Sequence, residues 1–314
     1  MSSRLRTGYL GPEGTFSQAA ALTAPAVQDG ELVALDTIHA IVLAVRDGAV
    51  DRAVLPIENS LEGSVNATLD ALVFEAENVR ITGETVLAVE QCLITHEQLP
   101  LSEVEVVISH PQATAQCRAY IQQHMPQARV MSSSSTAEAV RLVTERIRHR
   151  WAAIGTRLAA ELYGCVVLKP GIEDVHDNQT RFVWIARADS ATPDADAAPA
   201  NGSGSAGSGS AAAGTGVIQP ETGRGQWKTA IVFWGDGTES AGWLTGCLSE
   251  LSERGVNMNR IESRPLREGL GSYMFFADLD GRDCDQPVRE ALEGLRKRAG
   301  VLRILGSFPA AARY

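Results

Sequence analysis

The chain has 314 residues, of which 44% are hydrophobic and 21% are charged, and its formal net charge is -10 at pH 7. A chain of this length is typical of two or three domains, because a single hydrophobic core seldom grows to that size. The negative charge disfavours nucleic acid as a partner, and no apolar run approaches the roughly 18 residues that a membrane span requires.

The N-terminus runs directly into a strand-like segment at residues 7–10, without the apolar stretch that a secretory signal contains. We therefore expect the protein in the cytoplasm. Its five cysteines are widely spaced and include no C-x-x-C pair, which argues against a disulfide framework and against a zinc site. We expect reduced thiols in the core, and neither a metal nor a cofactor.

In the first 190 residues, short apolar runs alternate with amphipathic segments, a pattern typical of α/β layers with mostly parallel strands. Pro111 suits the first position of one helix, and Ser135 with Glu138 has the spacing of a capping box before another. Strands are expected over residues 7–10, 52–56, 104–109, 152–154 and 182–186. Helices are expected over residues 17–23, 38–46, 112–124 and 136–148.

Residues 189–225 consist largely of Ala, Gly, Ser, Pro and Asp. Such a segment has too few apolar side chains to offset the entropy of ordering it, so we expect a flexible linker between two domains. After it, the pattern predicts the βαββαβ order of a ferredoxin-like fold. These six elements are expected over residues 227–234, 241–254, 258–265, 271–279, 287–297 and 301–308.

Several motifs stand in a fixed order along the chain. Four precede the linker: residues 8–17 (GYLGPEGTFS), residues 55–60 (LPIENS), residues 109–112 (SHPQ) with Gln116, and residues 178–182 (NQTRF). Together they resemble the motifs of the prephenate dehydratase family. A fifth, GVNMNRIESRP at residues 255–265, resembles the phenylalanine-sensing form of the ACT domain, a small regulatory domain.

The resemblance implies a two-lobed α/β catalytic domain over residues 1–188, similar to type II periplasmic binding proteins, with the substrate between the lobes. One lobe is expected at residues 1 to about 80 plus about 170 to 188, and the other at about 81–169. The ACT domain is expected at residues 226–309. Because the dehydratase motifs begin near the N-terminus, with no room for a helical chorismate mutase domain, we expect a monofunctional enzyme.

The reaction implied by the resemblance removes carbon dioxide and the ring hydroxyl from prephenate, a dianion, and gives phenylpyruvate for phenylalanine synthesis. Aromatisation supplies much of the driving force, so hydrogen-bond donors aimed at the leaving oxygen suffice. Thr180 matches the family threonine at this oxygen, and it suits a donor or relay because an alcohol is a weak acid. Asn59 and Gln116 match further catalytic positions.

Three ionisable residues leave alternatives open. Glu58 is expected in catalysis either as a buried, protonated donor or as an ionised group that orients its neighbours. Arg181 either clamps a substrate carboxylate or forms a salt bridge with Asp174 or Asp177. His110 is either a general acid or a residue that shapes the turn before a proline.

The glycine-rich loop at residues 11–15 lacks the Lys-Ser/Thr of a Walker loop, so we do not expect a nucleotide there. Its glycines instead allow backbone amides to approach a substrate carboxylate. The residues expected to bind the substrate are Thr15, Ser17, Ser60, Ser109, Arg181 and Phe182.

Regulation by L-phenylalanine is implied by the second resemblance, with the effector bound between ACT domains of paired subunits in a homodimer or homotetramer. Trp243 stands where the family usually has alanine, and it either alters the pocket or covers it. Without the resemblance, residues 255–265 fit a helix C-cap and a strand with Ile261 facing inward. The expected pocket residues are Gly242, Trp243, Leu244, Asn257, Glu262, Ser263, Arg264 and Pro265.

Two other functions stay open at the level of the sequence. One is an arogenate dehydratase, which acts on the amino analogue of the same ring. The other is a non-enzymatic ligand sensor, because the first domain resembles solute-binding proteins. The presence of Asn59, Gln116 and Thr180 together argues against the sensor.

Overall fold

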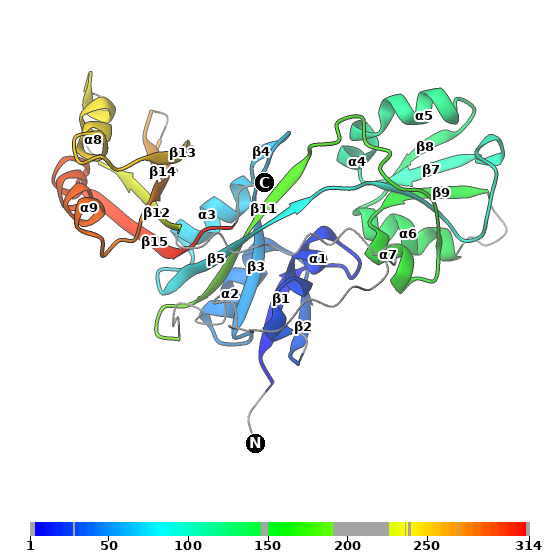
Figure 1. Cartoon of the computed structure of the whole chain (residues 1–314), viewed down its shortest axis with the longest axis horizontal. Coiled ribbons are helices and arrows are strands. Elements are labelled where there is room, and N and C mark those ends of the chain that lie inside the picture. The colour runs from blue at the N-terminus through cyan, green and yellow to red at the C-terminus, as the bar shows by residue number, and fades with distance from the viewer. Residues whose placement is uncertain are drawn as a thin grey trace, which may run out of the picture. The chain divides into compact units, whose positions relative to one another are not determined.

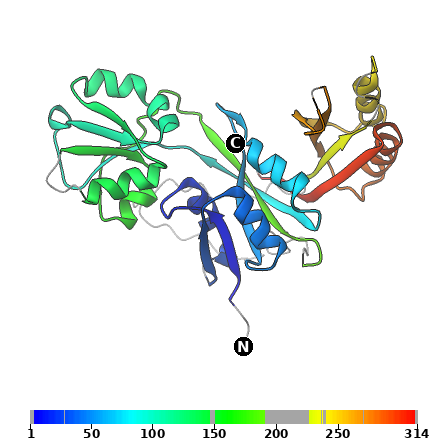
Figure 2. The same cartoon turned by 180° about the vertical axis from the view of Figure 1, so that it is seen from behind.

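The computed structural model describes residues 4–27, 29–145, 150–190, 226–235, 237, 240–269 and 271–311. Within these residues the chain forms three sheets with helices beside them, the mixed α/β class that the sequence predicts (Figures 1 and 2). Nearly all of the predicted linker, residues 191–225, and the predicted helix end at residues 146–148 lie outside the described residues.

The first sheet is formed by six strands: β1 (Arg6–Leu10), β2 (Glu31–Leu35), β3 (Arg52–Asn59), β4 (Gly63–Ser64), β5 (Val79–Ala88) and β11 (Gln179–Arg187). Their order is β2-β1-β3-β11-β5, with β4 on β3, and β1 pairs in parallel with both of its neighbours. The expected limit of the first lobe near residue 80 is too early, since β5 belongs to this sheet and alternates buried and half-buried residues over its first half.

Three helices follow strands of the first sheet: α1 (Phe16–Leu22), α2 (Ile38–Arg46) and α3 (Asn66–Phe74). The predicted bounds of α2 are confirmed, because Thr37 caps it by accepting a 3.0 Å hydrogen bond from the amide of Ala40. Thr15 caps α1 in the same way. A short 3-10 turn, Pro25–Val27, follows α1.

The second sheet contains β6 (Cys92–Thr95), β7 (Val106–Ser109), β8 (Arg129–Ser132), β9 (Trp151–Gly155) and β10 (Val166–Lys169), in the order β10-β6-β9-β7-β8. Its helices are α4 (Pro111–Gln116), α5 (Arg118–His124), α6 (Thr136–Glu145) and α7 (Arg157–Leu162), and a 3-10 turn spans Leu101–Glu103. The chain passes between the two sheets twice, before β6 and after β10, as the two-lobed expectation requires.

The single helix expected over residues 112–124 is two helices, which meet at Cys117. The Cys117 side chain is fully buried. Just after it, the carboxylate of Asp174 accepts hydrogen bonds from the backbone amides of Ala119 and Tyr120 at 3.0 and 3.3 Å. A new helix start is thus capped from a distant part of the chain, which local sequence patterns do not contain.

The third sheet contains β12 (Trp227–Trp234), β13 (Met258–Pro265), β14 (Tyr273–Asp280) and β15 (Val301–Pro309). All its pairs are antiparallel, in the order β13-β14-β12-β15, and α8 (Trp243–Ser252) and α9 (Gln286–Ala299) pack side by side on it (Figure 1). The predicted βαββαβ order is therefore confirmed. Ile261 is not inward-facing as one alternative expected: it lies on the edge strand β13 and is 40% exposed.

The chain divides into two compact units, one of Met1–Ala76 with Val86–Phe182 and one of Glu77–Thr85 with Val183–Tyr314. Both lobes of the expected catalytic domain contribute to the first unit. The third sheet belongs to the second unit. The predicted domain limits at residues 188 and 226 stay predictions.

The expectation of five core cysteines is only partly correct. Cys92, Cys117 and Cys247 are buried and Cys165 is half-buried, but Cys284 is exposed, and none forms a disulfide. Burial raises the pKa of the Cys92 thiol to about 12, which keeps it neutral and unreactive. Among the helices that the structure describes, none has the length and apolar character needed to cross a membrane.

Candidate active site

The candidate site lies where β3 ends and β11 begins, two strands that are neighbours in the first sheet. Asn59 is the last residue of β3, and its Nδ2 atom lies 2.9 Å from Thr180 Oγ1 and 2.8 Å from Asn178 Oδ1. Adjacent strands thus bring together two of the predicted catalytic residues, which are 121 positions apart in the chain.

The amide of Asn59 has only one orientation that satisfies its surroundings. Its Oδ1 accepts hydrogen bonds from the backbone amides of Leu61 and Glu62 at 3.0 and 3.1 Å, in the turn after β3. The side chain is 9% exposed. Because the oxygen is held by the turn, the two amide hydrogens point toward three acceptors: Asn178 Oδ1, the carbonyl oxygen of Gln179 at 3.1 Å, and Thr180 Oγ1.

Thr180 accepts a hydrogen bond from Asn59, and this determines what its hydroxyl group can do. A hydroxyl has one hydrogen to donate and two lone pairs to accept. With one lone pair occupied by Asn59 Nδ2, the Thr180 hydrogen can be donated to a further oxygen. Thr180 is half-buried, and its role as a donor to a substrate oxygen stays a prediction.

Asn178 connects these residues with the second sheet. Its Oδ1 accepts from Asn59 and from Ser60 Oγ, the latter at 3.2 Å, and its Nδ2 lies 3.4 Å from Gln116 Oε1 at the end of α4. Gln116 Oε1 also lies 3.4 Å from Gln91 Nε2. Neutral amides and hydroxyls from both lobes of the first unit thus form one network, in which Asn59, Gln116 and Thr180 take part.

Glu58 and Arg181 form an ion pair, with Arg181 Nη1 3.5 Å from Glu58 Oε2. The salt bridge expected between Arg181 and Asp174 or Asp177 is replaced by this one, because β3 and β11 are neighbouring strands. Successive side chains of a strand point to opposite faces, so Arg181 points away from the face that carries Thr180. The Arg181 side chain is only 11% exposed.

Several residues that were predicted to contact the substrate make hydrogen bonds or packing contacts within the protein. Ser109 is fully buried and donates to the carbonyl oxygen of Ile154 at 2.7 Å, and Phe182 is 1% exposed in the core. His110 caps α4, because its Nδ1 accepts from the amide of Gln112 at 3.3 Å, and this supports the turn-shaping alternative. Thr15 donates to the carbonyl oxygen of Leu10 at 3.0 Å.

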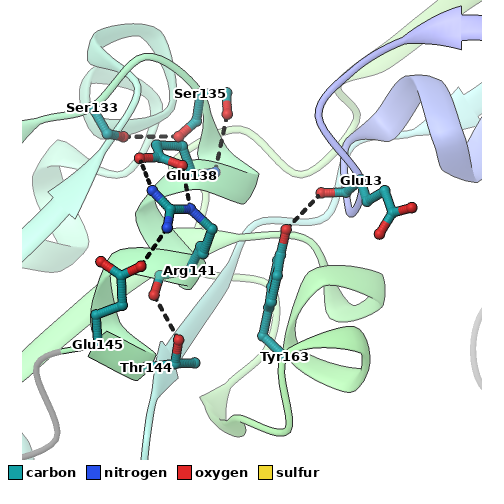
Figure 3. Close-up of polar contacts among 8 residues, drawn as sticks. All are labelled: Glu13, Ser133, Ser135, Glu138, Arg141, Thr144, Glu145 and Tyr163. Atoms are coloured by element: carbon teal, nitrogen blue, oxygen red, sulfur yellow. Dashed lines mark hydrogen bonds and ion pairs between the residues drawn. The ribbon is translucent and has the colours of Figure 1, made fainter. Parts of the chain in front are cut away.

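The loop at residues 11–15 contacts the second lobe within the first unit. The carbonyl oxygen of Gly14 accepts a 2.5 Å hydrogen bond from Thr156 Oγ1, which also caps α7. Tyr163 points from the end of α7 toward this loop, and its hydroxyl donates to the carbonyl oxygen of Glu13 at 3.4 Å (Figure 3). Burial and then the negative charge of Glu13 raise the pKa of Tyr163, so the phenol keeps its proton.

Beside Tyr163, Arg141 of α6 is held between two carboxylates, Glu138 and Glu145 (Figure 3). Ser135 accepts a 3.0 Å hydrogen bond from the amide of Glu138, so the predicted cap of this helix is confirmed. The Glu138 carboxylate pairs with Arg141 and not with the backbone amide of Ser135. Only one of the two hydrogen bonds of the predicted capping box therefore forms.

A substitution of Gly14 by alanine tests this contact between the lobes. Gly14 has a φ of +86°, and an added Cβ would lie 2.8 Å from the Cβ of Ala159 in α7. We expect Gly14→Ala to lower the free energy of unfolding by about 2 to 3 kcal/mol, because backbone strain and a steric clash act together.

The matched control is Gly164→Ala, at an exposed glycine with a φ of +64° and no heavy atom within 4 Å of an added Cβ. It should cost about 1 kcal/mol, because only the backbone strain remains. Urea unfolding of both variants gives the comparison. Equal losses of unfolding free energy in the two variants would show that the loop does not pack tightly against α7.

The residues expected to bind an effector lie in the second unit. Gly242, Trp243 and Leu244 start α8, and Glu262, Ser263, Arg264 and Pro265 end β13. Asn257 Nδ2 donates to Asp280 Oδ2 at 2.8 Å. The indole of Trp243 packs against the rings of Phe233 and Phe275 and donates to the carbonyl oxygen of Arg298 at 3.2 Å, and whether it alters or covers an effector pocket stays a prediction.

Three further residues were not predicted from the sequence as site residues: Gln91 and Asn178, which belong to the network, and Thr156, which contacts the loop at residues 11–15. Asn178 belongs to a quoted motif, and its position between a loop and a strand was the only available signal. Gln91 and Thr156 become recognisable only through contacts across the fold. Among the described residues, no group of three or more His, Cys, Asp or Glu side chains is arranged to hold a metal ion.

Comparisons with known proteins agree with the geometry. The prephenate dehydratase family model matches residues 7–190. The curated prephenate dehydratase of Amycolatopsis methanolica is 35% identical over 303 residues, which cover 96% of this chain and 88% of the relative.

Two solved structures are similar over nearly the whole chain. The prephenate dehydratase of Arthrobacter aurescens, in complex with L-Phe, has a TM-score of 0.78 and 32% identity, and the match covers 97% of this chain and 90% of that one. GqqA, described as a novel type of quorum quenching acylase, has a TM-score of 0.77 and 28% identity, with coverages of 97% and 98%.

Proposed function

Because the chain belongs to the prephenate dehydratase family, we propose that the amide and hydroxyl network at the ends of β3 and β11 converts prephenate to phenylpyruvate. The observation that carries this assignment of the site is the 2.9 Å contact from Asn59 Nδ2 to Thr180 Oγ1. In this proposal Asn59 occupies one lone pair of the Thr180 hydroxyl, so that the hydroxyl hydrogen can be donated to an oxygen of the substrate.

The reaction breaks two bonds and makes the substrate ring aromatic. The carbon–carbon bond to the ring carboxylate breaks, and its electron pair enters the ring as carbon dioxide leaves. The carbon–oxygen bond on the opposite side of the ring breaks, and the oxygen departs as water after taking up one proton. The dianion therefore becomes the phenylpyruvate monoanion, and negative charge develops on the leaving oxygen, where a fixed donor lowers the barrier.

In this proposal Thr180 donates to the leaving oxygen, and Asn59 holds the threonine in position. Gln116 contributes a second donor: its Oε1 accepts from Asn178 and Gln91, so its own amide hydrogens are directed to the substrate. All three side chains are neutral. Uncharged donors suit a substrate that must lose a carboxylate, because a strong cationic partner would stabilise that carboxylate in the ground state.

Glu58 takes the orienting role in this proposal, because its carboxylate lies 3.5 Å from the Arg181 guanidinium and is 38% exposed, whereas the alternative role requires a buried carboxyl group. Arg181 then stabilises the junction of β3 and β11. In this proposal the substrate carboxylates are held by backbone amides of the loop at residues 11–15 and by the exposed Ser60, whereas Thr15 and the buried Ser17 shape that loop and the start of α1. Ser109 and Phe182 shape the site from the core.

Feedback regulation by L-phenylalanine is the second part of the proposal. The second unit has the ferredoxin-like topology of an ACT domain, and the Arthrobacter aurescens relative was solved with L-Phe bound. We propose that a homodimer or homotetramer forms in the cytoplasm and binds the effector beside the end of β13 and the start of α8. In this proposal the half-buried Trp243, which packs against the core of the second unit, supports the helix start beside the pocket.

The assay for both parts uses the purified full chain with prephenate or arogenate, with and without L-phenylalanine. We expect phenylpyruvate from prephenate, little turnover of arogenate, and a lower rate when L-phenylalanine is added. Preferred turnover of arogenate would assign the chain to the amino analogue. Binding of prephenate without turnover in folded protein would support the sensor.

A further inference from the structure

Gln91 lies in the first passage between the two sheets, directly before β6, and is 3% exposed. Its backbone is fixed on both sides: its amide donates to Glu173 Oε2 at 2.8 Å, and its carbonyl oxygen accepts from the amide of Ile172 at 3.0 Å. Residues 172 and 173, in the second passage between the sheets, thus hold the backbone of Gln91 in the first passage. Such a position gives the side chain little freedom to move.

The Gln91 side chain is turned with its donor toward the active site. Its Nε2 lies 3.4 Å from Gln116 Oε1, and its own Oε1 is buried with no hydrogen-bond partner. A buried acceptor without a partner is unfavourable, and few native groups are left so. Turning the amide over would bring two oxygens, Gln91 Oε1 and Gln116 Oε1, face to face, so the contact with Gln116 determines the orientation.

Gln116 Oε1 therefore has two donors, Gln91 Nε2 from one side and Asn178 Nδ2 from the other, each at 3.4 Å. With only one of them, the Gln116 amide could rotate and present its oxygen to the substrate. An oxygen in that position would repel an anion, whereas an NH₂ group attracts it. Two donors on one acceptor select the rotamer that presents the NH₂ group.

We propose that Gln91 is a positioning residue for the dehydratase reaction, which acts by holding Gln116 with its amide hydrogens toward the substrate. The inference rests on the proposed function of Gln116. It assigns no contact between Gln91 and the substrate. The ionisable groups near Gln91 include Glu173, which accepts from its backbone amide, His176, whose Nδ1 lies 3.5 Å from Glu173, and the preceding residue Glu90, which pairs with Arg157.

The test compares Gln91→Met with Gln91→Glu. Methionine has nearly the same length and no donor, so we expect kcat/KM for prephenate to fall about 10-fold at every pH. A glutamic acid can donate only when protonated, and burial beside Glu173 raises its pKa. Gln91→Glu should approach the wild-type rate at low pH and fall below the methionine variant as pH rises, a profile that a purely structural role does not produce.

If the wild-type enzyme is active on prephenate, either of two results would overturn the inference. One is a methionine variant that retains the wild-type kcat/KM. The other is a Gln91→Glu profile parallel to that of the wild type. Melting temperatures of both variants show whether a rate was lost through unfolding.

A measurement that does not depend on catalytic turnover tests the positioning role separately from the proposed function. The side-chain NH₂ signals of Gln116, assigned by their loss in Gln116→Leu, should shift in the NMR spectrum of Gln91→Met. Unchanged signals would contradict the positioning role even if the wild type has no activity on prephenate. Inactivity of the wild type combined with a shifted signal would count against the proposed function alone.

Discussion

Replacing Thr180 by valine is expected to lower kcat for prephenate by about 100- to 1,000-fold, the usual effect of removing one donor from a developing oxyanion. Valine has nearly the same shape as threonine and keeps the β-branched side chain that suits β11, so the fold should persist. Stopped assays for phenylpyruvate at saturating prephenate give kcat directly.

Thr180→Ser is the matched control, because it retains the hydroxyl and loses only a methyl group. It should keep kcat within about 10-fold of the wild type, since the serine Oγ can still accept from Asn59 Nδ2. A valine variant as active as the serine variant would remove Thr180 from the chemistry. In that case the 2.9 Å contact would be structural only.

Replacing Asn59 by alanine should have the second-largest effect, and it should affect both activity and stability. The substitution removes the donor to Thr180 and Asn178 and the acceptor of two backbone amides in the turn after β3. Because buried groups then lose their partners, we expect the free energy of unfolding to fall by about 2 to 3 kcal/mol. A freely rotating Thr180 hydroxyl should lower kcat by about 100-fold.

The control for this loss is Asn66→Ala, at an exposed asparagine at the start of α3. It should change the free energy of unfolding by less than about 1 kcal/mol and leave kcat near the wild-type value. Urea unfolding and the phenylpyruvate assay are run on both variants. Similar losses in the two would mean that Asn59 has no special place in the network.

The parts of the fold that the sequence predicts well are those determined by neighbours along the chain. The bounds of α2, β12 and β13 are as expected: a local threonine cap specifies the start of α2, and the continuous apolar run at residues 230–234 marks β12. The break at Cys117 was not foreseen, since the cap of α5 comes from Asp174, 55 residues away. Interactions between distant segments leave no local pattern to detect.

The same distinction applies to the site. The motifs identify Asn59, Gln116 and Thr180, but the ion pair of Arg181 with Glu58 depends on β3 and β11 being neighbours. Two nearby aspartates made a local salt bridge one of the two alternatives for Arg181. Likewise, the packing of Trp243 at the start of α8 depends on Phe233 of β12 and Phe275 of β14, which lie elsewhere in the chain.

The most direct measurement of the central claim is a double-mutant cycle of Asn59→Ala and Thr180→Val on kcat with prephenate. If Asn59 acts by directing the Thr180 hydroxyl, its loss should matter little once that hydroxyl is gone, so the double variant should be less than about 3-fold slower than Thr180→Val alone. If the two single effects multiply instead, the two residues act independently, and the account of the site is wrong.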